Sequence, residues 1–235
     1  MNILLKLLAL LLTIGVSAQQ SLKQTQYAAY LTTSKMMWEK STKLAAKEHG
    51  EESFEKALAL YGLLNNTMAS KDEETFKKYK DETIELLEKL IEENPNWGEP
   101  KAVLSSTYGL VMAYSPMRGM FLGMKSNSLI TEALNLQPES ALVQKLYSGS
   151  KLYTPEMFGG DPEEAVESFS IAIDLFAKND ETTENWFYLD TMMGLSMAYL
   201  KTGQKAKAKD ILEKAIALEP NYYWAISELT KMDKS

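Results

Sequence analysis

Apolar residues recur at three- and four-residue steps along almost the whole chain after residue 20, and this spacing constrains the fold more than any other feature. In residues 72–93, for example, Phe76, Tyr79 and Leu90 lie on one face, while Lys and Glu fill the opposite one. This period gives each helix a single apolar stripe. The sustained alternation of apolar and polar residues that marks strands is missing. The sequence therefore predicts an all-α fold in which neighbouring helices cover each stripe.

Turn residues divide the chain into about ten helices. We predict them at residues 21–47, 51–68, 72–93, 97–114, 125–136, 139–150, 161–177, 184–201, 205–217 and 221–233. The sharpest start is Asp161-Pro162, because an Asp side chain caps free amides and Pro suits the first turn. The connections are short, which favours antiparallel neighbouring helices.

Three helices close on a proline, at Pro95, Pro138 and Pro220. The first two prolines are 43 residues apart and the last two are 82 apart, which is two units of 41. This period predicts an α-solenoid of four antiparallel helix pairs with a first and a last helix. We expect those two helices to cover the apolar ends of the stack.

Residues 1–18 have the features of a secretory signal peptide. Lys6 precedes the apolar residues 7–16, and Val16-Ser17-Ala18 provides a small-residue cleavage site. We expect cleavage, no membrane span in the remaining chain, and a single domain over residues 19–235. The expected location is the periplasm or envelope of a bacterium, with secretion as the other outcome.

The composition excludes several kinds of site. The chain has no cysteine and one histidine, so disulfides, cysteine zinc sites, lipid attachment to cysteine and HExxH metal sites are excluded. A net charge of −7 argues against nucleic-acid binding, which needs a basic face.

His49-Gly50 is interpreted as a helix break. Acidic clusters at helix ends complement the helix dipole. We assign no catalytic residue, metal or cofactor.

The last helix pair resembles a tetratricopeptide repeat without gaps over the 34 residues of that motif. The matching positions are Leu195, Tyr199, Gly203, Ala208, Leu212, Ala215 and Pro220. Ser196 and Met192 replace the usual glycine and tryptophan. A second set, from Gly159 to Ala172, is similar to the turn and second helix of another repeat.

The resemblance divides the chain into degenerate N-terminal helices at 21–96, clearer repeats at 97–220 and a capping helix at 221–233. An exported chain with long repeats and the turn at residues 157–162 is similar to bacterial envelope tetratricopeptide proteins. These include the accessory T component of some TRAP transporters.

The resemblance implies a non-catalytic scaffold that binds a protein or peptide through its concave face, which the first helix of each pair lines. Counting back from Pro138 and Pro220, it places groove-facing positions at Tyr108, Val111, Ser115, Arg118, Asp190, Met193, Met197 and Leu200. Of these, the predicted partner-binding residues are Tyr108, Val111, Arg118, Met193 and Met197. The chain's single arginine, Arg118, either binds a carboxylate of the partner or caps its own helix.

Two other functions stay open. A small-ligand-binding accessory protein of an envelope transporter predicts an enclosed aromatic pocket and self-association. The other open function is an enzyme that uses lysine or carboxylate side chains. Residues 108–124 are rich in Met and aromatic side chains, which suit either core packing or an adaptable binding surface.

Overall fold

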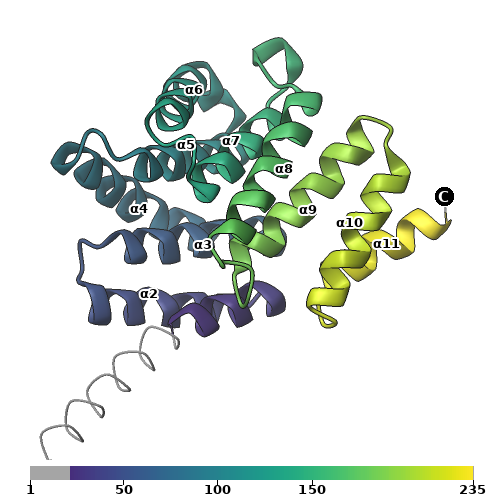
Figure 1. Ribbon diagram of the computed structural model, residues 1–235. Helices are drawn as coiled ribbons and strands as arrows, with labels where there is room; N and C mark the ends of the chain where they lie inside the picture. Colours follow the sequence, from purple (N-terminus) through teal and green to yellow (C-terminus); the bar gives the residue numbers. More distant parts are fainter. Residues whose placement is uncertain (1–21, 235) are drawn as a thin grey trace, which may run out of the picture.

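The computed structural model describes residues 22–234, and none of them lies in a β-strand (Figure 1). The predicted signal peptide, residues 1–18, lies outside this range. A helical segment at 22–32 is followed by α2 (Lys35–His49), α3 (Phe54–Ser70), α4 (Glu73–Glu93), α5 (Gly98–Tyr114), α6 (Gly119–Leu136), α7 (Ala141–Tyr153), α8 (Pro162–Lys178), α9 (Trp186–Lys201), α10 (Lys205–Leu218) and α11 (Tyr223–Lys234). Short 3-10 helices, η1 (Pro116–Arg118) and η2 (Glu156–Phe158), precede α6 and α8. None of the helices described combines the length and apolar character needed to cross a bilayer.

Consecutive helices pack as pairs: α3 with α4, α5 with α6, α7 with α8, and α9 with α10. The first helices of successive pairs also contact one another in order, so the pairs stack into a solenoid (Figure 1). We call residues 22–32 and helices α3, α5, α7 and α9 the helix-A row. Helices α2, α4, α6, α8 and α10 form the helix-B row. The predicted all-α solenoid is confirmed.

One predicted helix, 21–47, is two helices in the structure. Thr33 has a left-handed φ of 50°, and the Ser34 hydroxyl caps α2 by accepting a hydrogen bond from the Met37 amide. The chain reverses at this turn, so Leu22 packs against Ala45. The single first helix was wrong because the apolar spacing continues across a two-residue turn, and only the cap marks the break. These helices form one more pair at the start of the solenoid.

Two other helix ends test the predicted boundaries. The Asp161 side chain accepts hydrogen bonds from the amides of Glu163 and Glu164, at 3.0 and 3.1 Å, which confirms the predicted cap. The helix predicted at 125–136 begins already at Gly119, directly after η1. Glycine disfavours helix in isolation, so the pattern underestimated this helix, which α5 supports along its length.

The first helix pair lies against the last one. The Tyr27 hydroxyl donates to Glu219 Oε2 at 3.1 Å, and Gln24 Nε2 donates to Glu184 Oε2 at 3.2 Å. We expected the first and last helices to cover opposite ends of an open stack. Instead residues 22–32 contact Tyr222, in the turn between α10 and α11, because the solenoid curves back on itself (Figure 1).

Aromatic side chains fill the space where the ends meet. The edge of Trp38, which is 1% exposed, packs on Trp186 with 5.2 Å between ring centroids. Phe187 stacks on Trp186, and Tyr61 of α3 stacks on Phe187 at 6.4 Å. Each such pair adds about 0.5–1.5 kcal/mol beyond the area it buries. The concave side of the solenoid is therefore packed across its middle.

A polar network lies beside this aromatic cluster. Lys145 of α7 is 8% exposed, and its Nζ lies 2.6 Å from Asp190 Oδ2 on α9. The Tyr30 hydroxyl donates to Asp190 Oδ1 at 3.0 Å and shares a second hydrogen bond with the Tyr222 hydroxyl. One carboxylate thus ties together the helical segment 22–32, α7, α9 and the residue before α11.

The network fixes the protonation state of its members. Burial and the Asp190 carboxylate raise the pKa of Tyr30 and of Tyr222 well above their ordinary value, so both stay neutral. Burial alone would lower the pKa of Lys145, but the Asp190 charge outweighs burial and raises it. Lys145 therefore stays protonated at neutral pH and is neither a nucleophile nor a base.

Gly62 is the position where α2 and α3 approach most closely. A Cβ added there would lie 2.2 Å from the Trp38 ring, which Trp186 holds in place. We expect Gly62→Ala to lower the free energy of unfolding by about 1–3 kcal/mol. Gly109→Ala is the matched control, because its Cβ meets no atom within 4 Å and helix propensity predicts a gain of about 0.5–1 kcal/mol. Urea unfolding measures both, and equal effects would contradict the close approach.

Alkaline pH is expected to unfold the protein through the network. The raised pKa of Tyr30 and Tyr222 means that the unfolded chain loses these protons at lower pH than the folded chain. Stability is then complete below about pH 10 and falls above it by about 1.4 kcal/mol per pH unit for each group. Urea unfolding at pH 9 and pH 11 measures the loss, and Tyr222→Phe should reduce its slope. Equal stability at both pH values would contradict the assignment.

Candidate partner-binding site

The helix-A row stays open beyond the packed middle, along one face of α7. Lys145, Gly149 and Tyr153 follow at four-residue steps and so share that face. Lys145 contacts Asp190, which places α9 beside the same face. A Cβ added at Gly149 would meet no atom within 4 Å, so the space above this glycine is free.

Tyr153 marks the outer end of this open face. Its side chain is 65% exposed, yet desolvation by the surrounding helices and the Asp190 carboxylate raise its pKa to about 12. The exposed ring and the free space above Gly149 leave this part of α7 accessible to a partner. Aromatic rings with a polar tip are favoured contacts in protein interfaces. We call Lys145, Gly149, Tyr153, Asp190 and Met197 the α7–α9 recess.

Two of the predicted partner-binding residues lie on α9. Met197 is partly buried and packs at the margin of the core around Leu189 and Leu195. Met193 is 1% exposed and belongs to that core. Of the two, only Met197 is therefore partly accessible, on the same helix face as Asp190 seven residues earlier.

Tyr108 and Val111 of α5 are each 3% exposed. The Tyr108 hydroxyl donates to Glu88 Oε1 at 3.0 Å, and Lys125 Nζ lies 4.9 Å from the centre of its ring. Val111 packs beside Phe76 of α4. Helix α5 contacts α3, α4, α6 and α7, and these neighbours bury both side chains. Both side chains hold helices together in this structure.

Arg118 is exposed on η1, away from the α7–α9 recess. Its backbone amide donates to the Ser115 carbonyl at 2.9 Å, but within residues 22–234 no carboxylate pairs with its side chain. The five predicted residues thus fall on three separate places. Partner binding by them stays a prediction. The count from Pro138 crosses η1 and a lengthened α6, so it shifts the register relative to a 34-residue repeat.

The repeat pattern in the sequence did not indicate Lys145 and Tyr153 as partner-binding residues. The fourth helix pair lacks the closing proline from which the other positions were counted, and η2 interrupts its turn. The four-residue spacing of Lys145, Gly149 and Tyr153 was the available signal. The pairing with Asp190 and Tyr30 requires the tertiary structure.

The described residues contain no group of three His, Asp or Glu side chains that could hold a metal ion. His49 ends α2, where Gly50 has a φ of 106°, and its Nδ1 lies 3.7 Å from Glu55 Oε1. This matches the helix break expected from His49-Gly50.

Comparison with known proteins agrees with the geometry. The tetratricopeptide repeat family profile matches residues 189–222, which cover α9, α10 and the turn after them. No curated protein sequence matches the chain.

A solved structure shows the same fold. A thermophilic TPR protein of Thermus thermophilus, TTC0263, aligns over 95% of this chain and 97% of its own, with 18% identity and a TM-score of 0.57. MamA aligns over 84% of this chain and 92% of its own, with 14% identity and a TM-score of 0.42. The chain therefore carries a tetratricopeptide repeat at residues 189–222 and has the tetratricopeptide-repeat fold along its described length.

Proposed function

We propose that the protein is an exported, non-catalytic scaffold that binds a segment of a protein partner in the α7–α9 recess. The observation that carries this proposal is Tyr153, an exposed aromatic side chain beside free space on the helix-A row. A scaffold of this fold recognises a partner by side chains of successive first helices. Lys145 and Asp190 supply a charged pair at the base of the recess, and Met197 supplies an adaptable apolar contact.

This surface is narrower than the concave groove expected from the sequence. The packing of Trp38, Tyr61 and Trp186 across the middle occupies the part of the groove nearest to the first helix pair. A partner segment therefore meets α7 and α9, rather than the whole helix-A row.

The alternative, a small-ligand carrier of an envelope transporter, needs an enclosed aromatic pocket. The aromatic rings between the first and last helix pairs instead pack against one another at centroid distances of 3.7–6.4 Å. The geometry supports the partner-binding scaffold better.

Tyr153→Ala tests the recess. We expect it to weaken partner binding by about tenfold or more, as loss of an aromatic anchor does, without changing the unfolding temperature. Tyr223→Ala is the matched control, because Tyr223 is 71% exposed but lies on α11. A photo-crosslinking residue at each position identifies the partner in the native cell, and titration of the purified partner measures affinity. Adducts at 223 but not at 153 would refute the recess.

Export is a separate proposal that rests on residues 1–18 alone. We expect the chain recovered from a bacterial envelope to begin near Gln19 by N-terminal sequencing. Leu10→Arg, which interrupts the apolar stretch, should leave the uncleaved chain in the cytosol. A wild-type chain that keeps Met1 and stays in the cytosol would overturn this proposal.

A further inference from the structure

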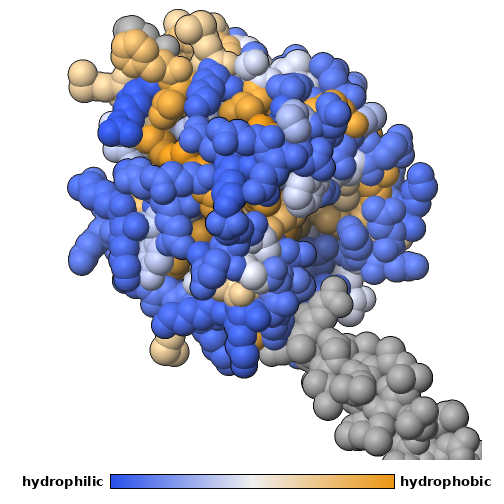
Figure 2. Space-filling view, turned by 90° about the vertical axis from the view of Figure 1, so that its left-hand side faces the viewer, coloured by the Kyte–Doolittle hydropathy of each residue, from blue (hydrophilic) through white to orange (hydrophobic). Residues whose placement is uncertain are grey.

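The outer face of α6 differs from the outer faces of other helix-B helices. Every exposed position of α4 is charged, and those of α10 are mostly Lys, Asp and Glu. Along η1 and α6, in contrast, one exposed row has no charge: Met117, Phe121, Met124, Ser128, Thr131 and Asn135. We call these six residues the α6 seam. Figure 2 shows apolar side chains gathered at the top of the molecule, where Figure 1 places both α6 and the turn between α7 and α8.

The α6 seam has the spacing of a helix–helix contact. Its residues follow at steps of four, three, four, three and four, which is the 3.5-residue period of a coiled-coil seam. Met117 is 90% exposed, and Phe121 and Met124 are each 78% exposed. Nothing within residues 22–234 covers them, so this seam is unpartnered in the single chain.

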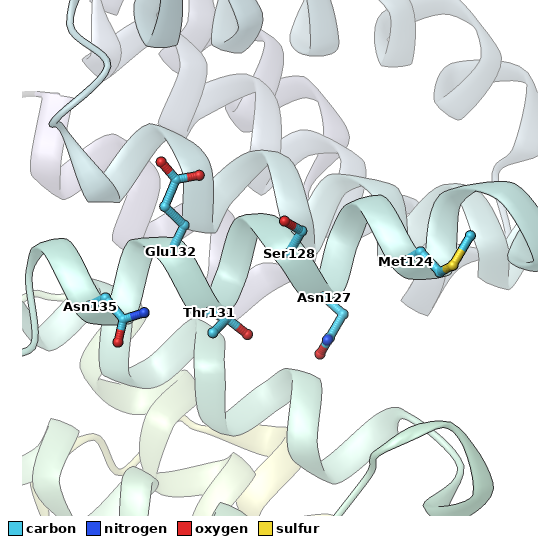
Figure 3. Close-up of a pocket in the computed structure, with 6 residues that line it drawn as sticks. All are labelled: Met124, Asn127, Ser128, Thr131, Glu132 and Asn135. Atoms are coloured by element: carbon cyan, nitrogen blue, oxygen red, sulfur yellow. The ribbon is translucent and has the colours of Figure 1, made fainter.

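The two halves of the α6 seam complement each other in shape. The N-terminal half carries the large side chains of Met117 and Phe121. The C-terminal half lines a shallow, open hollow formed by Met124, Asn127, Ser128, Thr131, Glu132 and Asn135 (Figure 3). A helix packed in the opposite direction would bring large side chains onto the hollow.

The charges beside the α6 seam complement each other in the same way. Arg118, Lys125 and Glu132 follow at seven-residue steps along one flank. Glu132 is 50% exposed and uses Oε1 for Lys101, and within the described chain no carboxylate pairs with Arg118. Antiparallel pairing of two such helices places Arg118 beside Glu132. It also brings the two Lys125 side chains near each other, where Glu88 of the same chain, 3.0 Å from each Lys125 Nζ, offsets their charge.

We propose that a second copy of this chain packs its α6 seam against the first, antiparallel, about a two-fold axis between Met124 and Ser128. One register then matches Met117 with Asn135, Phe121 with Thr131, and Met124 with Ser128, and it brings Arg118 to Glu132. Such an interface is isologous, so each contact occurs twice.

The charge distribution on the α6 seam permits a second copy to bind there. Each chain has a net charge of −7, so two copies repel unless they meet on a neutral or self-complementary surface. The α6 seam is neutral, and Arg118 and Glu132 beside it have opposite charges. It lies apart from the α7–α9 recess. A result that contradicts the dimer therefore leaves the proposed partner binding unaffected, and the reverse also holds.

The oligomeric state of the full chain tests the proposal. By sedimentation equilibrium we expect a reversible dimer whose dissociation constant rises about tenfold or more in Phe121→Asp, which places a charge in the contact. Phe158→Asp is the matched control, because Phe158 is 71% exposed on η2, outside the α6 seam. Unchanged thermal unfolding confirms that both variants fold. A monomer at every concentration, or equal effects of the two variants, would overturn the proposal.

Cross-linking tests the direction of packing, because the chain has no cysteine of its own. In the proposed register, two copies of residue 124 lie about 6 Å apart along the helix and two copies of residue 135 about 27 Å apart. A short bis-maleimide should therefore link Met124→Cys chains but not Asn135→Cys chains. Linking of both variants indicates parallel packing, and linking of neither indicates another interface. Either result rejects the two-fold arrangement.

Discussion

The contact between the first and last helix pairs is the interaction on which the rest of the structure depends. Trp38 and Trp186 meet edge to face, and beside them Asp190 joins Lys145 and Tyr30. The Trp38–Trp186 and Tyr30–Asp190 contacts link residues 148 and 160 positions apart, so they hold the curvature of the whole solenoid. A buried charge pair is stabilising only when both partners are present and hydrogen-bonded, and here Tyr30 and Tyr222 complete the network.

This closure decides which surfaces are left for function. The middle of the concave side is packed with aromatic rings, and four neighbouring helices bury Tyr108 and Val111 of α5. What stays open is the outer end of α7, at Tyr153, and the outer face of α6. The two 3-10 helices η1 and η2 begin or border these surfaces. The lengthened turns that make the repeats longer than 34 residues thus carry exposed Met and Phe side chains.

Most of the fold was predictable, because helix periodicity and caps are local properties. The Asp161 cap and the last repeat, with Tyr199 and Pro220, needed only neighbouring residues. The break at Thr33 was missed, since the apolar period runs through it. The site was less predictable: Tyr108 and Val111 have the expected helix position, but burial depends on how many helices surround α5. Residues 108–124 serve both as core and as surface.

The sequence by itself determined an all-helical repeat protein without cysteine chemistry, because apolar spacing, caps and composition act within one or two helical turns. It also identified its last repeat from closely spaced residues. Only the tertiary structure decided that the first and last pairs meet, that Lys145 stays charged beside Asp190, and that the α6 seam has no cover within the described chain. These outcomes depend on the summed rotation between successive helix pairs, a quantity that no single segment of the sequence encodes.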